Sequence, residues 1–168
     1  MKTLKMSIFL LALLLAAMIM VPIVSAVSQT DGNTGGMELT KTGYVSAKLA
    51  SQNGASPNAV QATYTWTAGS NIWSSGVTVS STHYSYSRLN NAPYDINTIE
   101  VRGRVWKNNN LMWDQTQTAY NAADASLNYN SGIGNPIVGS WFERSNHRFI
   151  DPADSDSWTP VTEKSVNC

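Results

Sequence analysis

The residues most able to do chemistry lie in one short stretch, Val101 to Gln115, which reads VRGRVWKNNNLMWDQ. Two arginines, Arg102 and Arg104, and two tryptophans, Trp106 and Trp113, surround a run of asparagines. A guanidinium group over an indole ring is favourable by about 0.5–1 kcal/mol at an exposed site. Aromatic rings can also stack on sugar rings, and arginines beside them can donate hydrogen bonds to the sugar hydroxyls. We predict that these four side chains bind a ligand; the alternative is that they only stabilise an exposed sheet face.

A second candidate is an aspartate-rich loop near the C-terminal end. It holds His147, Asp151, Asp154 and Asp156. Carboxylate oxygens on a short loop are the ligands that Ca²⁺ prefers. The EF-hand pattern is missing, because the loop has no glycine at the turn position and no glutamate at its end. Ordinary turn capping explains the same aspartates, so we predict no metal and no other cofactor.

Recognisable catalytic motifs are missing from the sequence. His83 or His147 could belong to a Ser–His–Asp set, but there is no nucleophile elbow, no His-Glu-x-x-His and no glycine-rich phosphate loop. Paired carboxylates for glycoside cleavage would have to come from a small stock: Glu100, Glu143, Asp95 and Asp114. We therefore expect a protein that is not an enzyme, and a small hydrolase is the third hypothesis.

The first 26 residues have the three parts of a secretory signal peptide. Lys2 and Lys5 precede a long apolar run, and Val24-Ser25-Ala26 supplies small residues for cleavage. The alternative is an uncleaved anchor, because an apolar run of about 18 residues can just span a bilayer. Cleavage is the prediction, so we expect a protein that is secreted or held at the cell surface. A membrane is expected to be involved only if this segment is retained.

Charge and cysteine content narrow the choice of partner. The chain has 11 Lys plus Arg and 11 Asp plus Glu; removing Lys2 and Lys5 with the signal segment leaves 11 − 2 = 9 against 11, a net charge of −2. No basic cluster is present, so nucleic acid is not an expected partner. Cys168 is the single cysteine, so a disulfide within the chain is excluded. The expected partner is an extracellular carbohydrate or a surface protein. The lack of an Asn-x-Ser/Thr acceptor favours a prokaryotic origin.

Alternation of apolar and polar residues predicts strands that would position these groups. Val60 to Thr67 and Asn97 to Val105 alternate most strictly, and Gly, Asn, Pro and Ser clusters separate the runs. Between Val77 and Ser87 the apolar positions change face near Ser81-Thr82, which predicts a β-bulge or a turn. Only Ala119 to Leu127 has a helix-leaning composition. This rhythm predicts an all-β fold, an antiparallel β-sandwich of immunoglobulin-like or related type.

The hairpin that carries the first candidate site has a specific predicted register. Asn108-Asn109 should occupy the centre of a type I′ turn, because asparagine tolerates positive φ. Such a turn sets three cross-strand pairs: Trp106 with Leu111, Val105 with Met112, and Arg104 with Trp113. Both arginines and both tryptophans then share one face. A loop of three or five residues is the competitor and would break the Arg104–Trp113 pair.

The expected organisation is a signal peptide over residues 1–26, a flexible lead-in over 27–36, a β-sandwich core over 37–130 and an irregular C-terminal segment over 131–168 that packs on the sandwich. The leading hypothesis is a small exported β-sandwich without catalytic activity that binds or coats an extracellular or cell-surface ligand, with polysaccharide as a candidate. The second hypothesis is a secreted toxin-like or bacteriocin-like protein that acts on other cells.

Overall fold

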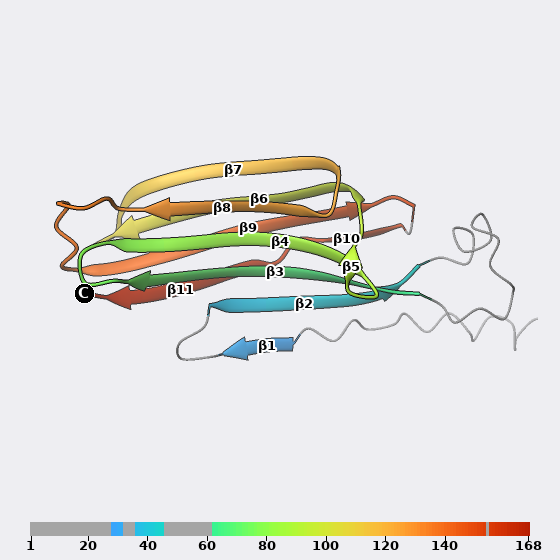
Figure 1. Cartoon of the computed structure of the whole chain (residues 1–168), viewed down its shortest axis with the longest axis horizontal. Coiled ribbons are helices and arrows are strands. Elements are labelled where there is room, and N and C mark those ends of the chain that lie inside the picture. Colours follow the sequence, from blue (N-terminus) through green and yellow to red (C-terminus); the bar gives the residue numbers. More distant parts are fainter. Residues whose placement is uncertain (1–27, 32–35, 46–61, 154) are drawn as a thin grey trace, which may run out of the picture.

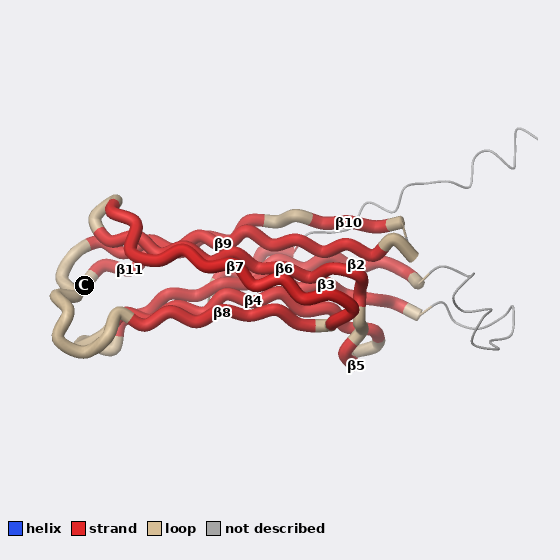
Figure 2. The backbone as a smooth tube through the Cα atoms, turned by 90° about the horizontal axis from the view of Figure 1, so that it is seen from above, coloured by secondary structure: helices blue, strands red, loops and turns tan. Residues whose placement is uncertain are grey.

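Two antiparallel β-sheets lie face to face in the computed structural model, which describes residues 28–31, 36–45, 62–153 and 155–168 (Figures 1 and 2). All the regular elements in these ranges are strands, so the predicted all-β antiparallel sandwich is confirmed. The predicted signal peptide lies outside the described residues. Within those residues the structure contains no helix that is long and apolar enough to cross a membrane.

The two sheets have a simple order of neighbouring strands. The first sheet runs β1 (Ser28–Asp31), β2 (Met37–Tyr44), β3 (Thr63–Ser74) and β4 (Val79–Leu89), and β4 also pairs with the short β5 (Ala92–Pro93) and with β8 (Asp124–Asn130). The second runs β7 (Asn110–Ala122), β6 (Ile96–Lys107) and β9 (Ser140–Asp151), and β9 also pairs with β10 (Asp156–Trp158) and β11 (Val161–Asn167). The chain therefore changes sheet between β5 and β6, between β7 and β8, and between β8 and β9.

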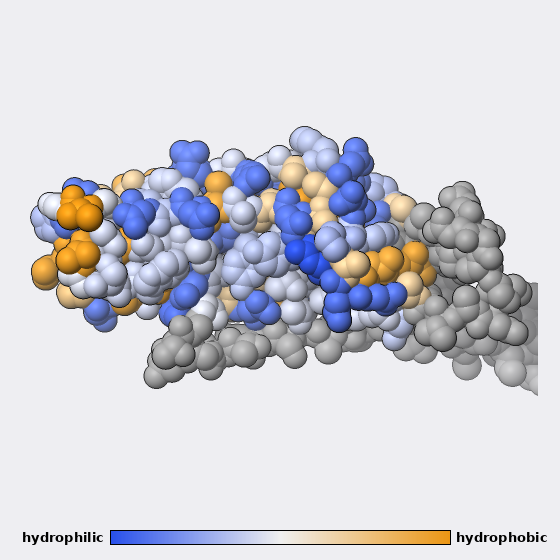
Figure 3. Space-filling model, viewed as in Figure 1, coloured by the Kyte–Doolittle hydropathy of each residue, from blue (hydrophilic) through white to orange (hydrophobic). Residues whose placement is uncertain are grey.

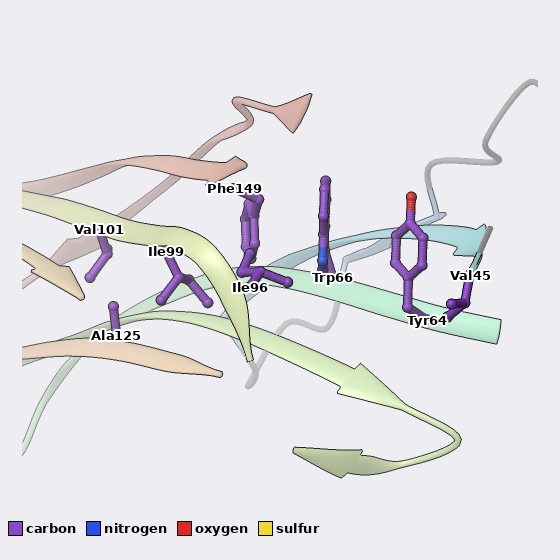
Figure 4. Packing of buried hydrophobic residues seen from close by; sticks show 9 residues of the cluster. Val45, Tyr64, Trp66, Ile96, Ile99, Val101, Ala125 and Phe149 are labelled. Atoms are coloured by element: carbon purple, nitrogen blue, oxygen red, sulfur yellow. The ribbon is translucent and has the colours of Figure 1, made fainter. Parts of the chain in front are cut away.

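Alternating side chains from both sheets fill the interior with two separate apolar clusters. In the larger cluster Trp66 is 0% exposed and stacks on Phe149, with ring centroids 5.4 Å apart (Figure 4). Its other buried members are Val45, Tyr64, Ala68, Ile96, Ile99, Val101 and Ala125. The smaller cluster consists of Ile72, Val79, Val105 and Trp141. Trp66 and Tyr64 face inward, as the alternation in Val60 to Thr67 predicts.

β4 alternates without interruption, so the bulge or turn predicted near Ser81-Thr82 is wrong. Its inward residues are all buried: Val79, Ser81, His83, Ser85 and Ser87. Tyr84 and Tyr86 lie on the opposite face and stack on each other with ring centroids 4.9 Å apart. The apolar pattern changes face in the sequence because the inward positions after Val79 are polar.

Three segments are more regular than the sequence predicts. Part of the lead-in expected to be flexible forms β1, which pairs with β2. The irregular segment expected over residues 131–168 contains β9, a strand of 12 residues that pairs with β6 along ten residue pairs. The helix-leaning stretch Ala119 to Leu127 forms the end of β7 and the start of β8. The central strand β9 is therefore formed by residues that show no alternation of apolar and polar types.

Candidate binding face

The turn of the β6–β7 hairpin has the predicted length and conformation. Lys107 pairs with Asn110, so Asn108 and Asn109 are the two central residues. Their φ angles are 49° and 65°, in the left-handed region that a type I′ turn requires. The Asn108 side chain also ties this turn to β9, because its Oδ1 accepts a hydrogen bond from the backbone N–H of Ser140 at 2.9 Å.

A register shift directly behind the turn changes the second strand. Trp106 pairs with Leu111 as predicted, but Val105 pairs with Trp113, so Met112 is an extra residue in a β-bulge. The predicted pairs of Val105 with Met112 and of Arg104 with Trp113 are therefore wrong. A shift of one residue moves every later side chain of the strand to the other face. Trp113 consequently faces the interior, on the side of Val105.

Trp113 packs inside the sandwich rather than beside the arginines. Its ring stacks on His83 with centroids 5.3 Å apart and contacts Tyr129 at 5.7 Å. Gly103 makes this packing possible, since a Cβ atom there would lie 2.7 Å from the His83 ring and 2.8 Å from Trp113 Cζ3. The four predicted binding residues are thus divided: Arg102, Arg104 and Trp106 lie on the outer face, and Trp113 lies on the inner face.

Four side chains form a mixed aromatic, cationic and polar surface on the outside of the second sheet. The Trp106 and Phe142 rings lie 5.4 Å apart, centroid to centroid, with an angle of 38° between their planes. The Arg104 guanidinium carbon lies 5.5 Å from the centre of the Trp106 ring. Arg104 also donates a hydrogen bond from Nη2 to Asn146 Oδ1. We call Arg104, Trp106, Phe142 and Asn146 the Trp106 face.

Sequence reasoning missed Phe142 and Asn146, which β9 contributes to this surface. Phe142 is opposite Trp106 in the β6–β9 pairing, and Asn146 is opposite Arg102. The stretch around Phe142 shows no strict alternation of apolar residues, because the inward neighbour Glu143 is charged. Only the position of β9 beside β6 brings these residues to the site, and sequence spacing does not fix that position.

Arg102 is held at the border of the Trp106 face by an acidic partner on β7. Its Nε donates to Asp114 Oδ1 at 2.8 Å and its Nη2 to Oδ2 at 2.6 Å. This two-point contact raises the pKa of Arg102 and lowers the pKa of Asp114. An exposed pair of this kind contributes little to stability. Its clear effect is to fix the position of the Arg102 guanidinium and to offset part of its charge.

The histidine, serine and carboxylate groups considered for catalysis do converge, but in the closed interior. His83 Nδ1 lies 2.6 Å from Ser145 Oγ and 3.4 Å from Glu143 Oε2. His83, Ser145 and Glu143 are each 0% exposed. Ser81 and Ser70 complete the contacts, since Ser81 Oγ lies 2.8 Å from His83 Nε2 and Ser70 Oγ donates to Glu143 Oε1 at 2.6 Å. A substrate cannot reach these atoms while the sheets are packed. The visible role of the network is to join β3 and β4 to β9 across the interior.

The described residues of the aspartate-rich loop do not gather into the possible calcium site. His147 is buried between Ser85 and Thr162, with each hydroxyl oxygen 2.9 Å from a ring nitrogen. Asp151 Oδ1 accepts a hydrogen bond from the backbone of Ala153. The Asp156 carboxylate accepts hydrogen bonds from Lys41 and Tyr64. Asp154 lies outside the described residues, and those residues contain no group of three possible metal ligands.

A small pocket opens near the turn end of the sandwich. Its volume is about 130 Å³, below the roughly 300–1,000 Å³ typical of ligand pockets. Its lining residues are Lys107, Met112, Tyr129, Ser131, Asn135, Pro136 and Trp141. An open face is therefore a better candidate for recognition than this cavity.

No protein-family model matches the chain, and no curated protein matches it. Among solved structures, the variable domain of the AgI/II polypeptide BspA from Streptococcus agalactiae is similar. The match covers 83% of this chain and 78% of that one, with 10% sequence identity and a TM-score of 0.18. A TM-score of this size does not establish a common fold.

Proposed function

We propose that the protein is an exported, non-enzymatic β-sandwich that binds a polysaccharide outside the cell through the Trp106 face. The observation that carries this proposal is the contact between the Trp106 and Phe142 rings, with the Arg104 guanidinium next to Trp106. Aromatic rings combine a large apolar surface with low conformational entropy, so they suit the apolar faces of sugar rings. Arginine and asparagine side chains supply hydrogen bonds to the hydroxyl groups at the edges of the sugars.

The architecture supports a rigid recognition surface. Trp106 lies on β6, which pairs with β7 on one side and with β9 on the other. Phe142 lies on β9, which is held between β6 and β11. Side chains on the inner strands of a sheet are positioned more accurately than side chains on loops. Little conformational entropy would then be lost when a ligand binds.

The test is retention of the full chain on insoluble polysaccharides and cell walls, in comparison with a Trp106→Ala variant. We expect the variant to lose retention, because the larger of the two rings is gone. Tyr120→Ala is the matched control, since Tyr120 is an aromatic residue on β7 that is 71% exposed and lies outside the Trp106 face. Retention that survives in Trp106→Ala, or that is lost equally in Tyr120→Ala, would contradict the proposed face.

A different observation favours the toxin-like alternative. Apolar side chains are strongly exposed at the end of the sandwich that holds the β3–β4 turn, the β6–β7 turn and the 131–139 loop (Figure 3). They are Val77, Leu111, Met112, Ile133 and Val138, with exposed fractions of 61%, 53%, 51%, 87% and 75%. Such a surface suits contact with another protein or a membrane. Dye leakage from lipid vesicles that is abolished in an Ile133→Ser/Val138→Ser variant would favour this alternative.

A further inference from the structure

The charges around the Trp106 face are compensated unevenly. Arg102 is bound by Asp114, and Arg144 is bound by Glu163. Arg104 is next to both of these arginines, since it follows Arg102 by two residues on the same face of β6 and is opposite Arg144 on β9. On β7 it is opposite Asp114. Within the described part of the chain, Arg104 makes no ion pair, and its hydrogen-bond partner Asn146 is uncharged.

The outer surface of β6, β7, β9 and β11 therefore carries an excess positive charge at its centre. Its cations are Arg102, Arg104, Arg144 and Arg148, and its acids are Glu100, Asp114 and Glu163, which gives 4 − 3 = +1. Two of the three acids already bind the flanking arginines Arg102 and Arg144. The third, Glu100, accepts a hydrogen bond from Thr118 at 2.7 Å.

The environment of Arg104 is unfavourable for its charge. Burial lowers the pKa of Arg104, the charges of Arg102 and Arg144 lower it further, and Asp114 opposes them. The Arg104 Nε is buried and has no hydrogen-bond partner among the described residues. An anion beside the guanidinium would relieve the repulsion between the three arginines and would gain a charge-assisted hydrogen bond.

We infer that the ligand of the Trp106 face is an acidic polysaccharide, whose carboxylate pairs with Arg104 while its sugar ring packs on Trp106 and Phe142. This inference rests on the proposed function and adds the chemical class of the ligand. Arginine suits this role because its planar guanidinium matches the geometry of a carboxylate. The Trp106 ring lies beside that group and in contact with the Phe142 ring, so one hexuronate unit could contact both features.

Two polymers that differ only in charge test the inference. The full chain is applied to immobilised polygalacturonate and to its methyl ester, which has the same sugar rings without the carboxylate charge. We expect the acid form to be bound at least about tenfold more tightly, the range of one charge-assisted hydrogen bond. Added NaCl should reduce the difference, because salt screens exposed charges. Non-specific ion exchange is not expected, because the whole chain has a formal net charge of 0.

Three variants separate the inference from the proposed function. Arg104→Gln should bind both polymers with the weaker affinity of the ester, and Trp106→Ala should bind neither. Arg88→Gln is the matched control, because Arg88 is an ion-paired arginine on the other sheet, and it should behave as the unmodified chain. Equal binding of acid and ester that is lost in Trp106→Ala would overturn the acidic ligand and leave the proposed function in place. Retention by neither polymer would overturn the acidic ligand, and the wider polysaccharide panel then decides the proposed function.

Discussion

At the scale of single residues, Gly103 determines whether an aromatic ring can enter the core from β7. The inward position of Gly103 leaves room for the stacked rings of His83 and Trp113. We expect Gly103→Ala to destabilise the fold by about 1–3 kcal/mol, because the new methyl group would overpack this site. Urea denaturation measures the change in the free energy of unfolding.

Making the same Gly103→Ala substitution in a second variant identifies which side chain causes that loss. In a Trp113→Leu chain one of the two rings that confine Gly103 is replaced by a smaller side chain. The added cost of Gly103→Ala should then be smaller, because contacting residues couple energetically. An unchanged cost would mean that the His83 ring, rather than the Trp113 ring, opposes the methyl group.

At the scale of elements, the β6–β7 hairpin shows how far sequence reasoning reaches. The asparagine pair predicts the turn correctly, because positive φ is a local property of residue type. The extra residue Met112 has no comparable local signal, yet it moves Trp113 from the arginine face to the core. The predicted site could therefore be located on the right hairpin but not assembled from the right side chains.

The turn itself offers a sharp test at this scale. Asn109 has a φ of 65°, where a residue with an ordinary Cβ atom is disfavoured by roughly 1–2 kcal/mol. We expect Asn109→Ala to lower the free energy of unfolding by about 1 kcal/mol, because asparagine already tolerates this region and alanine does not. Asn109→Gly should be neutral or stabilising. Urea midpoints of the two variants measure this, and an equal loss in both would show that the Asn109 side chain, rather than its backbone angle, matters.

The misread strands β4 and β9 share one physical cause. Both place polar side chains inward: Ser81, His83 and Ser85 on β4, and Glu143, Ser145 and His147 on β9. An apolar alternation pattern detects strands whose buried face is apolar, as in Val60 to Thr67 or Asn97 to Val105. It cannot detect strands whose buried polar groups find their hydrogen-bond partners on the other sheet. The fold class is still predicted correctly, because the remaining strands alternate apolar and polar residues and are separated by typical turn residues.

At the scale of the whole molecule, the polar side chains form a layer between the two apolar clusters. Hydrogen bonds cross from one sheet to the other through His83 and Ser145, Ser70 and Glu143, and Ser85 and His147. Such bonds have strict geometry, whereas apolar contacts tolerate sliding. The layer therefore aligns the two sheets along their strands. Within its own sheet, β9 is held beside β6 by their backbone pairing, with the Trp106 face on the outer side.

This layer should make the stability of the whole molecule depend on pH through His147. Burial, and then the neighbouring His83, lowers the pKa of His147 to about 3, whereas an unfolded histidine has a pKa of about 6.5. Below about pH 6.5 the unfolded chain therefore binds a proton that the folded chain does not. Stability from this group should be complete above that pH and should fall towards about pH 3, by up to about 1.4 kcal/mol per pH unit. Urea titrations between pH 7 and pH 5 measure the slope. His147→Gln keeps a hydrogen-bonding side chain but cannot titrate, so its slope should be flatter, and an unchanged slope would assign the pH dependence to other groups.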